Sequence, residues 1–310
     1  MMAAGMHDLE IGVACACVAS ILFDLGVALQ AMEARDVSHD HGLRPSLLGR
    51  LVARPRWVFA TLLAAAGWPF HVVALLLAPL TVVQPALASG LLLLLVLGDR
   101  MLGERVGPLE VGAVLAIILG VAGMAWAAPE HTSHHAGFLR LAPALGGLGL
   151  LAVAPYVARR EAAAASALLP LSAGCAYAWT GISSKLIADY LSSSMWAVAV
   201  AWAAATGLVA LLGLLSEMSA LQRRPATRVV PVVFVVQITV PVVLAPLVSG
   251  ESWASTPLGG LALLGFLTFV AAGAGALGRT TAVSGLVAAG ADQLGDGYPP
   301  EAARGKATVQ

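Results

Sequence analysis

Two charged side chains lie deep inside apolar stretches of this sequence. Asp24 is the one carboxylate well within such a stretch, thirteen residues, or ~20 Å of helix, beyond Ile11 where the stretch begins. Lys185 lies inside another apolar stretch. A charge in hydrocarbon costs a few kcal/mol, so each residue is expected to face a partner or a water-filled cavity. Asp24 could therefore bind a cation or carry protons, and Lys185 could be its counter-charge.

Both charges also have structural interpretations. If Asp24 lies nearer the inner membrane surface than its position suggests, it is simply solvated there. Lys185 is close to the outer end of its stretch, where it could extend outward and pair with Asp189 one helical turn later. The sequence leaves both alternatives open.

Three uncharged polar residues occur at similar depth. His71 follows Pro69, which frees backbone carbonyl groups, and its imidazole could relay protons or contact a substrate. Gln84 and Gln237 could supply further polar contacts. All three could instead hydrogen-bond between neighbouring helices.

The sequence contains no recognisable cofactor or enzyme motif. It has no phosphate-binding loop and none of the side-chain arrangements of intramembrane proteases, so we expect neither a cofactor nor catalysis. Glu130, His131, His134 and His135 could bind a metal ion in a loop, although short loops of this kind are usually just solvated. Whether any metal binds is left open.

Nine apolar blocks must position these residues. The composition is 59% hydrophobic and 11% charged, which lies outside the range of soluble proteins. The blocks cover 11–32, 57–77, 81–98, 108–126, 138–157, 165–187, 195–216, 229–248 and 258–278. Each has about the ~20 residues that a helix needs to cross a bilayer, and they lack the alternation of a membrane β-barrel. The sequence thus predicts an all-α polytopic membrane protein.

Positive charges follow every second block. Fifteen of the seventeen Lys and Arg residues fall in these alternate gaps or beyond the last block, and Arg140 and Lys185 are the exceptions. By the positive-inside rule these gaps face the cytoplasm. We therefore expect a multi-pass protein of the cell membrane with its N-terminus outside and its C-terminus in the cytoplasm.

Two stretches of the chain follow the same plan. Pro85 is expected to open a helix that ends in Gly103-Glu104, with Glu104 nineteen residues after the proline. Pro231 is expected to open another that ends in Gly250-Glu251, with Glu251 twenty residues after it. A Pro and a Gly-rich block follow each helix. Pro241 is expected to kink the second of these helices. The two stretches are five blocks apart, an odd number, so the second copy must be inverted in the bilayer. Chance similarity between low-complexity stretches is the alternative.

This repeat divides the chain into four parts. They are a first four-helix repeat over 1–130, an outer loop and linker helix over 131–161, an inverted four-helix repeat over 162–279, and a disordered cytoplasmic tail over 280–310. The prolines and the two Gly-Glu pairs would lie at helix breaks or at gates between open and closed states.

The first repeat is similar to a known superfamily. Residues 78–123 read APLTVVQPALASGLLLLLVLGDRMLGERVGPLEVGAVLAIILGVAG, which resembles the drug/metabolite transporter superfamily and its EamA-type members. The segments GVALQAMEARDV, PRW and APEH look closer to its NIPA-like magnesium transporter branch. The resemblance implies a helical transporter in which Glu104 and Glu251 match the family's Gly-Glu motif. EamA-type proteins have ten helices, whereas here the basic segment 34–56 replaces an early one.

These observations favour a secondary transporter that moves a small solute by alternating access. The first alternative is a carrier of magnesium or another divalent cation, and the second is a membrane scaffold or assembly protein that transports nothing. The expected partners are the lipid bilayer and a small-molecule or cation substrate, without nucleic acid. A homodimer is left open.

Overall fold

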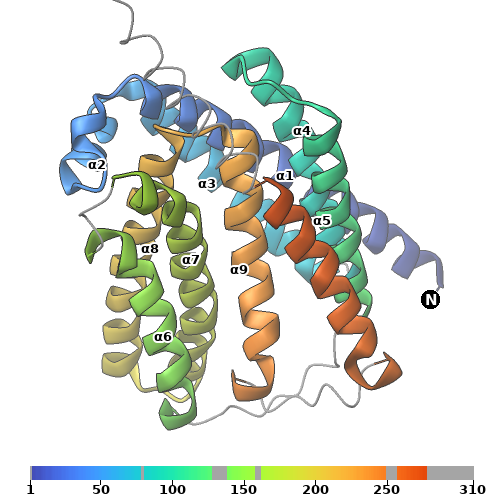
Figure 1. The fold of residues 1–310 in the computed structure, drawn as a ribbon. Helices are drawn as coiled ribbons and strands as arrows, with labels where there is room; N and C mark the ends of the chain where they lie inside the picture. Colours follow the sequence, from blue (N-terminus) through green and yellow to red (C-terminus); the bar gives the residue numbers. More distant parts are fainter. Residues whose placement is uncertain (1, 78–79, 128–137, 158–161, 249–256, 278–310) are drawn as a thin grey trace, which may run out of the picture.

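The computed structural model describes residues 2–77, 80–127, 138–157, 162–248 and 257–277, and this part of the chain is all-helical (Figure 1). It contains ten α-helices. They are α1 (Met2–Arg35), α2 (Pro45–Val52), α3 (Pro55–Leu77), α4 (Leu80–Leu102), α5 (Pro108–Ala127), α6 (Phe138–Val157), α7 (Ala162–Ser192), α8 (Trp196–Leu221), α9 (Ala226–Val248) and a last helix over 261–277 that follows the turn η3 (Pro257–Gly260).

Five helical segments are long and apolar enough to cross a membrane. They cover Asp8–Arg35, Pro85–Leu102, Pro108–Ala127, Trp196–Leu221 and Pro257–Leu277. The predicted all-helical fold is confirmed, and these five segments agree with the predicted multi-pass membrane protein by their length and composition. Each of the nine expected apolar ranges also overlaps one of the long helices. That all nine span a bilayer, that the two halves are inverted copies, and which end faces the cytoplasm stay predictions.

The two prolines expected to open helices lie inside them instead. α4 begins at Leu80 and α9 at Ala226, so Pro85 and Pro231 each lie five residues beyond the first residue of their helix. Proline has no N–H, and each therefore costs its helix one backbone hydrogen bond. Membrane helices tolerate this because neighbouring groups can satisfy the freed carbonyl. Pro241 lies ten residues farther along α9.

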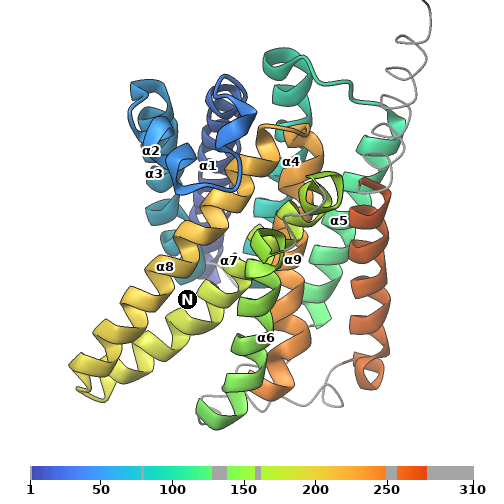
Figure 2. The same cartoon turned by 60° about the vertical axis from the view of Figure 1, so that its left-hand side comes forward.

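The helices pack in two groups. α1 packs against α3 and α4, and α4 packs against α5, whereas α7 packs against α6, α8 and α9. α7 and α8 form a long antiparallel pair that slants across the bundle (Figure 2). α9 contacts helices of both groups, including α7 and α4, and lies in the middle of the bundle (Figure 1).

Glycines bring the last helix close to α5. A Cβ atom added at Gly120 would overlap the Cγ2 atom of Val270, and one at Gly273 would lie 2.6 Å from the carbonyl oxygen of Ala113. A side chain at either position would push the two helices apart. Small residues of this kind permit the close approach that membrane helices use in place of a hydrophobic driving force.

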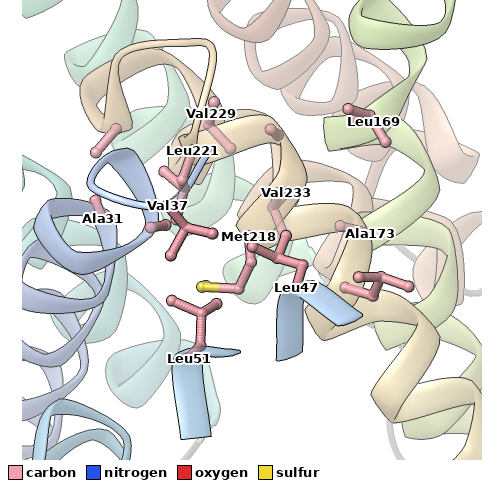
Figure 3. Packing of buried hydrophobic residues seen from close by; sticks show 14 of the residues in the cluster. Ala31, Val37, Leu47, Leu51, Leu169, Ala173, Met218, Leu221, Val229 and Val233 are labelled. Carbon is pink, nitrogen blue, oxygen red and sulfur yellow. The ribbon is translucent and has the colours of Figure 1, made fainter. Parts of the chain in front are cut away.

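The basic segment between α1 and α3 folds over one end of the bundle. After the turn η1 (His39–His41), it forms α2, whose Leu47 and Leu51 are one turn apart on a single face. Both side chains are fully buried, in one cluster with Met218 and Leu221 near the end of α8 (Figure 3). We call these four residues the end plug, because they close the bundle where α1 and α8 end.

Candidate functional site

A cavity of about 390 Å³ lies among α1, α3, α4, α7, α8 and α9. Apolar and aromatic side chains form most of its wall. The polar lining residues are Ser20, Asp24, His71, Tyr177, Glu217 and Gln237. Three of the five residues that the sequence suggested for substrate binding, Asp24, His71 and Gln237, therefore line one cavity.

Asp24 is held at the cavity wall by α1 and α4 together. The hydroxyl of Ser20, one turn earlier on α1, is 3.2 Å from Asp24 Oδ2 and 3.0 Å from the carbonyl oxygen of Leu87 on α4. A hydroxyl has one proton, so it donates to only one of these acceptors at a time. The Asp24 residue is 7% exposed. The Asp24 carboxylate thus has few hydrogen-bond partners for a buried group, and it borders the cavity.

Gly90 on α4 makes room for this arrangement. A Cβ atom at Gly90 would overlap both Ser20 Oγ and Asp24 Oδ2. Because glycine has no Cβ, the α4 backbone can pass directly beside the carboxylate. The position of Asp24 therefore depends on a small residue of α4 as well as on α1.

The cavity contains a second buried carboxylate that the sequence interpretation missed. Glu217 on α8 is 7% exposed, and its Oε2 accepts a 2.7 Å hydrogen bond from the hydroxyl of Tyr177 on α7. The predicted apolar block over 195–216 ends one residue before Glu217. α8 in fact continues to Leu221, which places Glu217 one turn inside it. The cavity wall thus contains a second buried carboxylate beside Asp24.

His71 and Gln237 line the cavity from two different helices, α3 and α9. The His71 ring makes an edge-to-face contact with Phe23, with 6.3 Å between ring centroids. Its Nε2 atom is buried and has no hydrogen-bond partner among the described residues. Gln237 is exposed on the cavity side of α9. Gln237 therefore presents its amide to a bound solute, whereas His71 lines the cavity with a buried, unpartnered Nε2 atom.

Several other predicted residues fall outside the described part of the chain. Gln84 and Lys185 belong to α4 and α7, but their side chains are not among those described, and Glu251 lies wholly outside. The pairing of Asp24 with Lys185 stays a prediction. The histidine-containing loop over 128–137 is likewise outside, and the described residues contain no cluster of three or more potential metal ligands.

Glu104 caps the N-terminus of α9. Its Oε1 accepts the backbone N–H of Ala226 at 2.6 Å, and its Oε2 accepts the backbone N–H of Thr227 at 2.9 Å and the Thr227 hydroxyl at 2.6 Å. The first N–H groups of a helix have no partner within the helix, and its dipole favours a negative charge there. The Glu104 carboxylate, just after α4, thus accepts the first N–H groups of α9, which begins 122 residues later in the chain.

Two glycines at the C-terminal end of α4 allow Glu104 to reach α9. Gly98 lies in the last turns of the helix, and Gly103 follows it directly. Gly103 has φ +62, in the left-handed region where glycine carries no steric penalty, and it reverses the chain directly after α4. Glu104 then donates its own N–H to the Gly98 carbonyl at 2.9 Å. At Gly98 a Cβ would overlap the Thr227 Cγ2 atom. The Gly-Glu pair noted in the sequence is therefore a helix end built to approach another helix.

Arg35 joins two more helix ends to this cap. Its guanidinium forms an ion pair with Glu104 and also donates to the carbonyl oxygens of Leu102 and Leu221, each at 3.4 Å. Those carbonyls are the unsatisfied ends of α4 and α8, where a cation is favourable. We call Arg35, Glu104 and the capped residues Ala226 and Thr227 the end clamp. It connects α1, α4, α8 and α9 beside the end plug.

A second ion pair ties α9 to α5 at the same end. Arg228 Nη2 lies 3.0 Å from Glu110 Oε1, while Glu110 Oε2 accepts the backbone N–H of Gly107 at 3.0 Å. Gln222 Nε2 also donates to the Val37 carbonyl at 3.1 Å, across the plug. Polar contacts therefore close one end of the bundle around α9.

The cavity can hold a small solute with polar or positively charged groups. It offers two carboxylates, a phenol, an imidazole and an amide inside an otherwise apolar bundle. Comparison of the chain with known protein families, curated proteins and solved structures finds no significant match.

Proposed function

We propose that this protein is a secondary transporter of the drug/metabolite type that moves a small solute by alternating access. The observation that carries the proposal is the cavity between the group of α1, α3 and α4 and the group of α7, α8 and α9. Substrate sites of secondary transporters lie near the midplane between two such halves. Asp24 is eleven residues, or ~16 Å of helix, from Arg35 at the end of α1, which suits that depth.

The buried carboxylates favour a transporter over a scaffold. Polar and ionisable groups inside a membrane are costly and are kept where they serve a pathway. A scaffold needs only helices that pack together, whereas Asp24 and Glu217 line a cavity between helices. The free-energy cost of burying two carboxylates is explained if they bind a solute in this cavity.

The closed end supports alternating access. The end clamp and the end plug seal the bundle on one side of the cavity, whereas Trp68 and Gln237 on its wall are exposed. In this proposal the described conformation is closed at the clamp and open away from it. Transport requires a second conformation in which the clamp parts, and Glu251 would hold the opposite end in the inverted repeat.

The charge pattern gives the proposed orientation. Basic residues gather at the clamp end, in the segments after α1, α4 and α8. By the positive-inside rule this end faces the cytoplasm, with the N-terminus outside. α1 packs against α3 and α4 in the same way that α7 packs against α8 and α9, and this similarity supports two related halves.

A divalent-cation carrier is the second candidate, because two carboxylates line one cavity. Mg²⁺ takes oxygen ligands and sheds water reluctantly, so it would bind through Asp24 and Glu217 with much of its hydration retained. The NIPA-like features of the sequence agree with this alternative.

Ligand binding followed by flux tests the proposal. Purified protein is first screened by thermal shift against Mg²⁺, amino acids and organic cations, since a ligand of the folded state raises its stability. Uptake of each ligand found is then measured in vesicles with wild type, Asp24→Asn and Glu217→Gln. The matched control is Asp99→Asn, which removes an exposed carboxylate at the end of α4.

We expect both cavity variants to lose binding and flux while the control retains them. Mg²⁺ as the one effective ligand would favour the second candidate. Unchanged flux in folded Asp24→Asn and Glu217→Gln would show that the cavity is not the transport site. Absence of binding and flux for every compound in wild type would leave the scaffold interpretation.

A further inference from the structure

A second cavity lies on the outside of the bundle, between α1 and α3. It has a volume of about 470 Å³ and is lined by Leu29, Met32, Glu33, Pro55, Arg56 and Phe59. It shares no residue with the central cavity. We call it the α1–α3 groove.

The groove is polar at one end and apolar along its length. Arg56 lies in the first turn of α3, at the clamp end of the bundle, and Phe59 follows it by one turn. On α1, Met32 and Leu29 lie one turn apart, leading away from the same end. Met32 and Phe59 are exposed. A ligand that fits must be charged at one end and apolar at the other.

The charge offered at the polar end is positive. Glu33 lines the groove, but its Oε2 is engaged by Arg54 Nη1 at 3.0 Å. Arg56 is exposed and forms no hydrogen bond or ion pair through its side chain with the residues that the structure describes. The groove therefore holds one neutralised acidic group and one uncompensated guanidinium.

The surroundings strengthen this positive end. Further exposed arginines occupy the loops and helix ends of the clamp end, at Arg44, Arg50, Arg100, Arg105 and Arg223. Basic residues beside membrane-spanning helices attract acidic lipids, each contributing a small favourable free energy. A zwitterionic lipid gains less, because its headgroup carries its own cation next to the phosphate.

We propose that the α1–α3 groove binds an acidic phospholipid. Its phosphate contacts the Arg56 guanidinium, whose planar fork matches phosphate oxygens. One acyl chain lies along Met32, Leu29 and Phe59. The lipid would hold the start of α3 against α1 at the end where the clamp closes the bundle.

Native mass spectrometry with defined lipids tests this site. Protein is released from micelles containing equal amounts of phosphatidylglycerol and phosphatidylcholine, and the lipids retained are counted. We expect wild type to retain phosphatidylglycerol in preference, with the preference reduced roughly fivefold in Arg56→Gln and reduced less in Arg56→Lys, which keeps the charge but lacks the planar fork. Arg50→Gln, which removes an exposed arginine on α2 outside the groove, is the matched control and should lower the preference far less than Arg56→Gln, because it removes only a distant attraction.

A second variant tests the apolar wall independently. Phe59→Ser changes a side chain that is 61% exposed and should not disturb folding. We expect it to lower retention of both lipids without changing their ratio.

Four results would overturn the proposal. They are equal retention of both lipids by wild type, an unchanged preference in Arg56→Gln, displacement of the lipid by millimolar inorganic phosphate, and a dimer whose dissociation follows Phe59→Ser. The third would make the site one for free phosphate, and the fourth would make the groove a contact with a second copy.

Discussion

Thr227 gives two hydrogen bonds to a single oxygen of Glu104. Its backbone N–H and its hydroxyl both donate to Oε2, at 2.9 and 2.6 Å, at the point where α9 begins. A residue of one half of the bundle thus supplies the cap that a helix of the other half requires. This contact joins the C-terminal end of α4 to the start of α9, and neither residue lines the central cavity.

Replacing Glu104 by glutamine should destabilise the protein by about 2–3 kcal/mol. The amide loses the ion pair with Arg35 and places a donor against the N–H groups of Ala226 and Thr227. Because the Arg35 side chain is 28% exposed, water offsets part of the loss. The measurement is the free energy of unfolding in mild detergent. Asp99→Asn, at an exposed position nearby, should change it by less than about 0.5 kcal/mol.

Gly98→Ala should cost about 1–3 kcal/mol because its methyl group would overlap Thr227 Cγ2. Thr227→Ser removes that methyl group but keeps the hydroxyl that Glu104 needs. The double variant should therefore recover much of the loss, as measured by a double-mutant cycle. Gly112→Ala is the control, since a Cβ there meets nothing within 4 Å. Additive effects of Gly98→Ala and Thr227→Ser would contradict the packing described.

Gly90→Ala should impair the central cavity more than the fold. The added methyl group overlaps Ser20 Oγ and Asp24 Oδ2, so the carboxylate must move into the cavity or α4 must move away. We expect weaker binding of any ligand found in the thermal-shift screen. Ser20→Ala in the same chain relieves the contact with the hydroxyl and should restore part of the binding. Wild-type affinity in Gly90→Ala would argue that the ligand does not approach Asp24.

Leu51→Ala should destabilise the clamp end by about 2–4 kcal/mol. The side chain is fully buried in the end plug, and its removal leaves a cavity beside Met218 and Leu221. Val52→Ala, one residue away but 59% exposed, should be nearly neutral. Hydrogen exchange of α2 and of the end of α8 would show whether the loss is local. Equal effects of the two variants would mean that α2 does not cover the bundle.

The sequence predicted the helices well because long apolar blocks carry a strong signal. Helices near 57–77 and 108–126 end within about two residues of the expected limits. α2 was missed, although Leu47 and Leu51 at a spacing of four are an amphipathic signal, because the segment is short and rich in arginine. The sequence predicts that Pro85 and Pro231 open their helices, whereas each helix begins five residues earlier.

The sequence could predict a site residue where a charged side chain lies well inside an apolar block. Asp24 was found because an isolated carboxylate in an apolar block is conspicuous, and it does line the cavity. Glu217 lies one residue beyond the predicted block over 195–216, and its burial depends on the packing of α8 against α7, which the sequence does not show. The partner of Glu104 could not be inferred either. The placement of α9 depends on packing between halves, which spacing along the chain does not encode.

The long sequence separation within the end clamp bears on how the chain is made. Glu104 precedes Ala226 by 122 residues, so α4 enters the bilayer well before the ribosome has delivered the N–H groups that its carboxylate caps. Until then, Glu104 lacks the three hydrogen bonds that it accepts from Ala226 and Thr227. The end clamp can therefore be completed only after the start of α9 has been synthesised.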